Sequence, residues 1–188
     1  MNREIDEYNI QLQRGDIQKA YRSIIGFMAK FWIYLKRKYP SHIISALYPG
    51  YMDMTYFSIT PENLKKHNLK IAIVYLHEPN AFEVWLSGVN RSVQAEYIKR
   101  LSNRKLNYRL SMIKPGVDSI VEHRIKTKPD FDRCQVMMSA IESEYLDFEH
   151  HVDSVLAKWL SFIPIELEKT AKLSTCEFED EQSVFLCL

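Results

Sequence analysis

The chain has 188 residues and a mass of 22.3 kDa, which suits one domain and is too short for two of full size. Lysine and arginine together number 25 and aspartate and glutamate 24, so the net charge is +1 with neutral histidines. This balance gives no global attraction to nucleic acid or to an anionic membrane. The most apolar run, residues 69–76, is far shorter than the ~20 residues needed to span a bilayer.

The sequence lacks the short motifs of phosphate-binding loops and of the common hydrolases. It has 5 glycines, none close to another, so neither G-x-G-x-x-G nor G-x-x-x-x-G-K-[ST] can be formed. Cys134, Cys176 and Cys187 are widely spaced, which argues against a disulfide framework and against a zinc ribbon. Residues 1–15 lack the apolar core of a signal peptide. We therefore expect a cytoplasmic protein.

The first predicted helix runs from Asp16, as its cap, to about Tyr39, because apolar residues recur there every three or four positions. Its polar face is basic and carries Lys19, Arg22, Lys30, Lys36, Arg37 and Lys38. Such a face would follow a phosphate backbone or would pack beside an acidic helix. We favour the acidic helix, so nucleic acid is not an expected partner.

Three strands are predicted in the middle of the chain. Tyr51–Ile59 is rich in aromatic residues, which favours a strand, and this strand would contain Asp53. Leu69–Leu76 is continuously apolar, which predicts a strand that is buried on both faces. Ala81–Gly88 alternates between apolar and polar residues and is predicted to pair back on it as a hairpin. Weaker alternation predicts further strands at residues 108–113 and 118–125.

Three more helices are predicted from their caps. Thr60 would cap a short helix, Asn90 a helix that ends near Leu101, and Asp130 a long helix that ends before Pro164. The long helix has an apolar seam of heptad-like spacing, formed by Cys134, Met138, Ile141, Tyr145, Phe148, Val152, Val155 and Trp159. Its outer positions are acidic, with Glu142, Glu144, Asp147, Glu149 and Asp153. The seam either packs on the sheet, which we favour, or forms a homodimer interface.

These elements predict an α/β (α+β) fold. A mixed central sheet of about five strands would be flanked by the N-terminal helix and the long C-terminal helix, because the central strand needs cover on both faces. We expect a single domain over residues 1–163. Residues 164–188 would be a C-terminal tail that is partly ordered or packed on this domain.

Several strings in the chain carry a resemblance: QLQRGDIQKAYRSIIGFM, YPGYMDMTYFSITPENLKKHNLKIAIVYLHE, FEVWLSGVNRSVQAEY, and the pair GVDSIVEH and KPDF. Among them, GYMDMTYF and FEVWLSGxNRxxQ are long enough to be specific. In these strings the chain resembles a family of uncharacterised bacterial proteins described as a domain of unknown function. The resemblance extends from Tyr8 to about Leu156. It implies bacterial relatives but no particular activity.

The order of helix, three-stranded meander, helix and strand also resembles, more distantly, the PD-(D/E)XK nuclease-like fold. That fold holds a divalent metal such as Mg²⁺ with an acidic residue on one strand and an acid-x-Lys on the next. The resemblance implies that Asp53 and Glu83 are the two acids. Trp85 stands where the lysine belongs, so Lys70 on a neighbouring strand would have to replace it.

Polar residues around the second hairpin strand form the candidate ligand site: Asp53, Glu83, Trp85, Asn90, Arg91 and Gln94. Glu83 and Trp85 share one strand face, where the tryptophan either lines a pocket or belongs to the core. The start of the helix at Asn90 either binds an anion or is simply capped. Asp53, in an aromatic-rich strand, is expected to pair with Arg91 or with a helix lysine, or else to be catalytic.

We therefore expect a non-catalytic or small-ligand-binding protein, with no cofactor. The alternative is a degenerate or metal-dependent nuclease-like protein that binds nucleic acid, with Mg²⁺ on Asp53 and Glu83. The two hypotheses differ in geometry. The enzyme needs both carboxylates close together with a lysine in reach, whereas the binding protein needs only a pocket.

Overall fold

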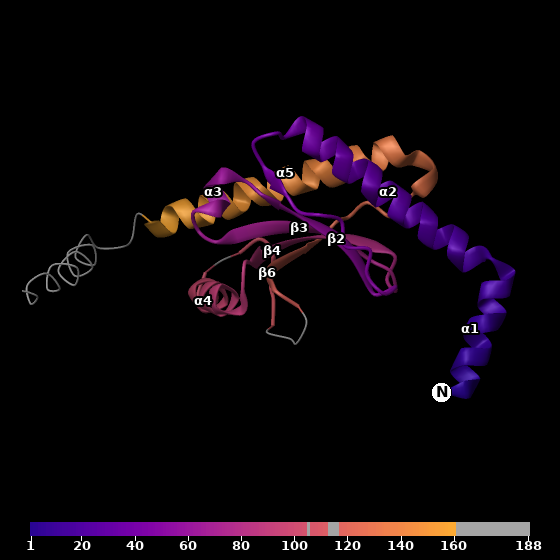
Figure 1. Cartoon of the computed structure of the whole chain (residues 1–188). Coiled ribbons are helices and arrows are strands. Elements are labelled where there is room, and N and C mark those ends of the chain that lie inside the picture. Colours follow the sequence, from indigo (N-terminus) through magenta and orange to yellow (C-terminus); the bar gives the residue numbers. More distant parts are fainter. Residues whose placement is uncertain (105, 113–116, 161–188) are drawn as a thin grey trace, which may run out of the picture. The chain divides into compact units, whose positions relative to one another are not determined.

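The computed structural model in Figure 1 describes residues 1–104, 106–112 and 117–160. The chain divides into two compact units, Met1–His151 and Val152–Leu188. The first unit holds the whole sheet, and the last helix begins in the first unit and ends in the second. The predicted tail, residues 164–188, lies outside the described residues.

The described elements follow the order that the sequence predicts, with three additions: a helix at the N-terminus, the short strand β1 and the 3-10 turn η1. The helices are α1 (Asn2–Arg14), α2 (Asp16–Lys38), α3 (Glu62–Lys65), α4 (Arg91–Leu101), the 3-10 turn η1 (Phe131–Arg133) and α5 (Cys134–Leu160). The strands are β1 (Ile43–Ile44), β2 (Met54–Thr60), β3 (Leu69–Leu76), β4 (Ala81–Gly88), β5 (Arg109–Leu110) and β6 (Ser119–Arg124). No helix within these described ranges is long and apolar enough to cross a bilayer.

The strands form one six-stranded sheet in the order β1-β2-β3-β4-β6-β5. The α+β class is confirmed, and all the strand pairs of this sheet are antiparallel. The predicted β3–β4 hairpin is confirmed at both ends, with Leu69 opposite Gly88 and Leu76 opposite Ala81. Because β3 is central and apolar throughout, both faces of the sheet need cover.

Helices α2 and α5 cover one face of the sheet (Figure 1). Phe31 of α2 packs edge-on against Phe57 of β2, with ring centroids 6.1 Å apart, and Phe27 lies 5.6 Å from Phe82 of β4. Buried residues of the predicted seam on α5 complete this core: Met138, Ile141, Tyr145 and Phe148. The seam from Met138 to Phe148 is therefore covered within the single chain. Cys134 at its start is partly buried, and the side chain of Trp159 lies outside the described part.

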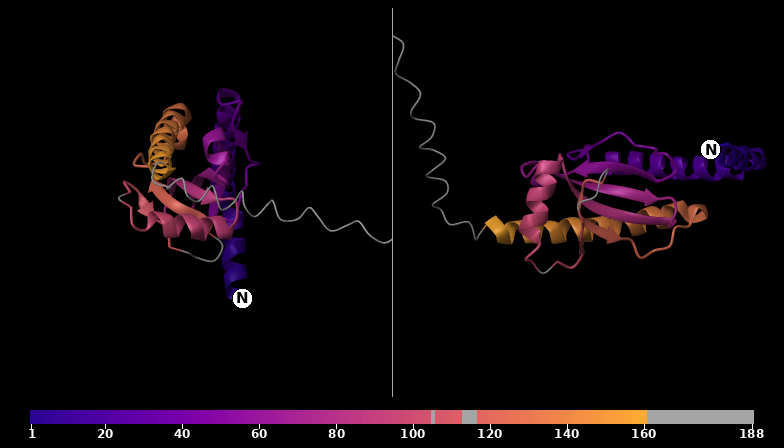
Figure 2. Two further views of the ribbon diagram at one scale, coloured as in Figure 1. Left: turned by 90° about the vertical axis from the view of Figure 1, so that its left-hand side faces the viewer. Right: turned by 90° about the horizontal axis from the view of Figure 1, so that it is seen from below.

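Helix α4 packs on β4 and β6 from the opposite face (Figure 2). It buries Gln94, Tyr97 and Leu101. At 11 residues it is short, and it covers only the end of β4 at which Gly88 lies. A Cβ on Gly88 would approach the Gln94 backbone nitrogen to 2.9 Å, so the absence of a side chain lets helix and strand approach closely. The remainder of this face lies over β2, β3 and β4.

Helix α1 was not predicted from the sequence, and two predicted caps are wrong. Gly15, with φ of 77°, ends α1 and is also the residue before α2, so Asp16 is the first residue of α2 and not its cap. Glycine adopts this left-handed conformation without the usual penalty. Pro61, not Thr60, precedes α3. Asn90 does cap α4, because its Oδ1 accepts a hydrogen bond from Val93 N at 2.9 Å.

The predicted contact between a basic and an acidic helix is confirmed at one point. Glu142 of α5 is 6% exposed, and its carboxylate lies 2.9 Å from Lys38 Nζ of α2. Tyr34 and Tyr39 donate hydroxyl hydrogen bonds to the same carboxylate at 2.8 and 2.6 Å. Burial raises the pKa of Glu142, but these donors outweigh it and lower the pKa. Burial and the bond to Glu142 raise the pKa of Tyr39 to about 12.

Replacing Glu142 with glutamine should destabilise the protein by about 2–3 kcal/mol, because a buried carboxylate with three donors loses its charge. Urea unfolding at neutral pH measures this loss. Asp147→Asn, on an exposed position of the same helix, is the matched control and should change the free energy of unfolding by less than about 0.5 kcal/mol. Equal effects of the two variants would contradict a role for Glu142 in joining α2 to α5.

Candidate functional site

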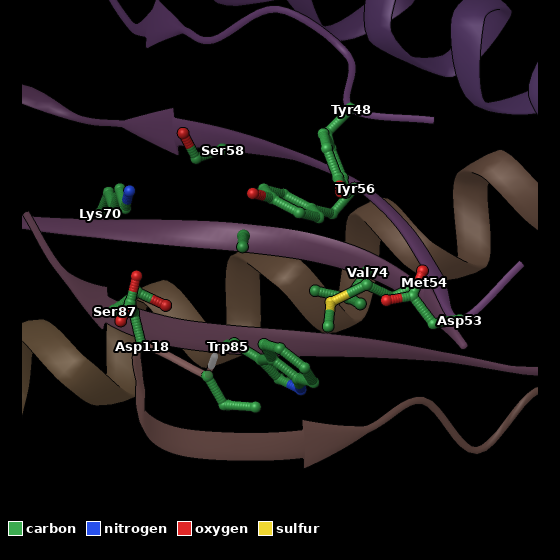
Figure 3. A pocket seen from close by; sticks show the side chains of 12 residues that line it. Tyr48, Asp53, Met54, Tyr56, Ser58, Lys70, Val74, Trp85, Ser87 and Asp118 are labelled. Carbon is green, nitrogen blue, oxygen red and sulfur yellow. The ribbon is translucent and has the colours of Figure 1, made fainter. Parts of the chain in front are cut away.

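A pocket of about 200 Å³ opens on the sheet face opposite α2 and α5 (Figure 3). It lies over β2, β3 and β4, beyond the end of the sheet that α4 covers. Its lining combines aromatic, aliphatic and polar side chains: Tyr48, Asp53, Met54, Tyr56, Ser58, Lys70, Ala72, Val74, Trp85, Ser87, Val117 and Asp118. Mostly apolar walls with a few polar groups are typical of small-molecule sites.

Strand register explains why the face is hollow at this point. Ala72 of β3 lies opposite Ser58 of β2 and opposite Trp85 of β4. A methyl group thus stands between two larger neighbours, and it forms the floor of the pocket. The rings of Tyr56 and Trp85 stand on either side of this floor (Figure 3).

The polar lining groups sit at two ends of the pocket (Figure 3). Lys70, Ser58 and Ser87 lie at one end, together with Asp118. Asp53 lies at the other, close to Met54 and Val74. The apolar floor and the aromatic rings separate these ends, so the site is amphipathic along its length.

The loop before β2 places Asp53 at the rim, and the predicted position of this residue inside a buried strand is wrong. Gly50 has φ of 73°, and a Cβ there would collide with the Met54 carbonyl oxygen. This turn delays the start of β2 to Met54 and leaves Asp53 exposed. The Asp53 carboxylate accepts a hydrogen bond from Tyr51 N at 2.9 Å. Bonds from backbone N–H groups lower the pKa of Asp53.

His77 fastens this rim to the sheet. Its Nε2 lies 2.9 Å from the hydroxyl of Thr55, which is fully buried and donates to the Pro49 carbonyl at 2.7 Å. The His77 ring also stacks on Tyr21 of α2, with centroids 5.8 Å apart. Burial lowers the pKa of His77, and the nearby Asp53 charge opposes this shift only in part.

Glu83 lies beside the pocket and is fully engaged in hydrogen bonds and an ion pair. It is 5% exposed and accepts from Trp85 Nε1 at 2.7 Å. Arg124, which lies opposite it on β6, donates from Nε at 3.0 Å. The hydrogen bond to Glu83 therefore fixes the orientation of the Trp85 ring in the pocket wall.

Glu122, the β6 neighbour of Trp85, has a similar set of partners. It accepts from the hydroxyls of Ser111 and Ser119 at 2.8 and 2.7 Å and forms an ion pair with Arg109 of β5. Burial raises the pKa of Glu122, but these bonds outweigh it and lower the pKa. On the β6 side of the pocket, both carboxylates, Glu83 and Glu122, are therefore paired with arginines.

The six predicted site residues separate into three groups. Asp53 and Trp85 line the pocket, and Glu83 supports Trp85 from beside it. Gln94 belongs to α4 and is buried between this helix and the sheet. Its side-chain amide donates hydrogen bonds to the carbonyls of Val117 and Ser119, at 3.0 and 2.9 Å, and so holds the segment that borders the pocket.

Asn90 and Arg91 are exposed outside the pocket. The expected Asp53–Arg91 ion pair is absent from the described residues, in which Glu83 pairs with Arg124.

The structure does not bring Asp53 and Glu83 together as a metal-binding pair. Asp53 precedes β2, and its carbonyl accepts from His77 N beyond the end of β3, whereas Glu83 lies opposite Val74 on β4. Two strand spacings, roughly 10 Å, separate them across the sheet alone. Across residues 1–104, 106–112 and 117–160, no three metal-ligating side chains gather.

Sequence reasoning missed most of the pocket lining, including Tyr48, Tyr56, Ser58, Ala72, Ser87 and Asp118. The sequence of β3 contains one feature that indicates a pocket. Lys70 and Ala72 are two positions apart, so they fall on one face of a strand whose other residues are large and apolar. A charged and a small residue on one face indicate a gap in the packing, but only the register shows which neighbours surround it.

Comparison with known protein families identifies the chain as a member of one of them. Residues 1–156 match the family described as Domain of unknown function (DUF7000), and the chain belongs to this family. No curated protein matches the chain, and no solved structure matches it either. The bacterial origin of the resembling proteins and the nuclease-like likeness stay predictions.

Glu83→Gln should destabilise the protein by about 2 kcal/mol, because the buried carboxylate loses the charge that strengthens its hydrogen bonds from Trp85 and Arg124. Asp53→Asn should change stability by less than about 1 kcal/mol, because Asp53 is exposed and an asparagine oxygen can still accept the hydrogen bonds from its backbone N–H neighbours. Chemical unfolding of both variants measures the difference. A larger loss for Asp53→Asn would mean that Asp53, and not Glu83, holds this face together.

His77 should make the protein less stable in mild acid. Because its pKa is lowered in the folded state, the unfolded chain binds the proton more readily, so stability falls as pH drops below about 6.5 and through the folded pKa. Unfolding midpoints at about pH 7.5 and pH 5.5 measure this loss. His77→Gln should reduce the difference between the two pH values, and His150→Gln, at an exposed position, should leave it unchanged. The same pH dependence in all three proteins would assign the effect to other groups.

Proposed function

We propose that this protein is a non-catalytic, small-ligand-binding protein whose site is the pocket on the β2–β3–β4 face. The observation that carries the proposal is the amphipathic hollow over Ala72, between the rings of Tyr56 and Trp85. The surrounding charges support it. Glu83 and Glu122 each form an ion pair with an arginine. These contacts fix the side chains next to the pocket, while the space over Ala72 stays open.

The size of the pocket limits the ligand. At about 200 Å³, it is smaller than the roughly 300–1,000 Å³ of typical drug-sized sites. A single or fused ring fits this space better than a whole nucleotide. The aromatic walls favour a flat molecule, because offset stacking on Tyr56 and Trp85 adds to the burial of apolar area.

The proposal of a non-catalytic role rests on the carboxylates. Glu83 is occupied by Trp85 and Arg124, and Asp53 stands at the far rim. A metal-dependent reaction needs two acids that converge on one open position. The proposal involves no cofactor and no nucleic acid.

We further propose that the protein acts in the bacterial cytoplasm, which suits its widely spaced cysteines. Of these, Cys134 lies in the described part and is a free thiol. A homodimer through α5 also stays a proposal. It would use faces of the helix other than the buried seam, such as the one that carries the exposed Val136.

Ala72→Leu should block binding by filling the pocket floor. The leucine side chain would occupy the space that the ring of a ligand needs, so affinity should fall about tenfold or more, which corresponds to about 1.4 kcal/mol or more. We would titrate the ¹⁵N-labelled protein with naphthamide, a flat uncharged probe, and follow the indole N–H signal of Trp85. That signal is assigned by comparison with Trp85→Phe.

Ala95→Leu is the matched control, because it makes the same change at an exposed position of α4. It should leave the titration as in the wild type. Thermal melts would establish that both variants are folded. Two outcomes would rule out the pocket as a binding site. One is that naphthamide changes the NMR signals of residues outside the pocket only, and the other is that Ala72→Leu and Ala95→Leu bind it equally well.

A further inference from the structure

Lys70 is a cation without a counter-charge at one end of the pocket. It is half-buried, and its side chain points to the pocket face of β3 (Figure 3). No hydrogen bond or ion pair of its ammonium group is found with the part of the chain that the structure describes. A half-buried lysine of this kind keeps its apolar stem against the sheet and leaves its ammonium group free to bind an anion.

The other charges on this face contrast with Lys70. Glu83 pairs with Arg124 and Glu122 with Arg109. The nearest carboxylate in the pocket lining is Asp118, which is exposed and forms no ion pair with Lys70 among the described residues. The cation is therefore available to a ligand from within the pocket.

Two hydroxyl groups accompany this cation. Ser58 and Ser87 are buried, 8% and 4% exposed, and both line the pocket beside Lys70. Ser87 lies directly opposite Lys70 in the β3–β4 pair, and Ser58 lies opposite Ala72 in the β2–β3 pair. One ammonium and two hydroxyls are donors that suit the oxygens of an acidic group.

The distance between this polar end and the floor sets the shape of a ligand. Lys70 and Ala72 are two residues apart on one strand face, which is about 7 Å. A ring that lies over Ala72, between Tyr56 and Trp85, would thus place a directly attached acidic group within reach of the flexible Lys70 side chain.

We infer that the pocket takes a planar aromatic acid, with its ring over Ala72 and its acidic group on Lys70, Ser58 and Ser87. This inference rests on the proposed function and deepens it by naming the chemical class of the ligand. A carboxylate lies at each end of the pocket, Asp53 at one and the exposed Asp118 at the other, but only the end with Lys70, Ser58 and Ser87 offers donors to an acidic group.

A pair of probes that differ only in charge tests the inference. Naphthoate is a carboxylate, and naphthamide is its uncharged amide of nearly the same shape. The wild-type protein should bind naphthoate about tenfold more tightly, because a hydrogen bond between charged partners is roughly twice as strong as a neutral one. This preference should shrink as salt is added, whereas naphthamide binding should not change.

Lys70→Met should remove most of the preference, because it weakens naphthoate binding about tenfold and naphthamide binding much less. Methionine keeps the approximate length and the apolar stem of the side chain. Lys66→Met, the same substitution at an exposed position, should retain the preference. If wild-type protein binds both probes equally, or if Lys70→Met weakens both alike, the acidic-ligand inference is wrong and the pocket still binds flat molecules. If neither probe binds, the proposed function fails as well.

Discussion

The need to cover both faces of the central β3–β4 hairpin dominates this structure. All eight residues of β4 are buried, and so are six of the eight in β3. Two long helices cover one face with aromatic side chains. Glu142 of α5, bound by Lys38, Tyr34 and Tyr39, joins α5 to the end of α2. The opposite face has one short helix at one end. No helix covers the rest of this face among the described residues, and only side chains of the sheet and its loops shield the strands there. The pocket lies in this part of the face.

The pocket face is stabilised chiefly by paired charges. Glu83 and Glu122 lie in neighbouring strands, and each has an arginine and hydroxyl or indole donors. The carboxylates are the less exposed members of these pairs, whereas both arginines are exposed, so loss of a carboxylate would leave its hydroxyl or indole donors without an acceptor. The pairs therefore fix the Trp85 wall in one position. A rigid wall lowers the conformational cost of binding, because the ligand does not have to order it.

The sequence was informative where the pattern is local. Leu69–Leu76 and Ala81–Gly88 are long apolar or alternating runs bounded by turns, and both were predicted to the residue. Asp53 was misplaced because Gly50 turns the chain directly before the aromatic-rich run, so the first residues of that run do not join the sheet and β2 begins only at Met54. The pocket was beyond prediction for a different reason. Its lining comes from several strands and loops, and only the register brings Ala72 between Ser58 and Trp85.

Ala72 connects stability with the proposed function. A larger apolar residue at this position would bury more area between Tyr56 and Trp85 and would add to the stability of the sheet. It would also fill the space in which a ring can lie, so a stable face and an open site are competing demands on one side chain. Lys70 shows a related competition, because an apolar residue there would bury more apolar area on this face but would offer no charge to an acidic ligand. Both residues are unfavourable for packing alone, and both become favourable once a flat acid occupies the pocket.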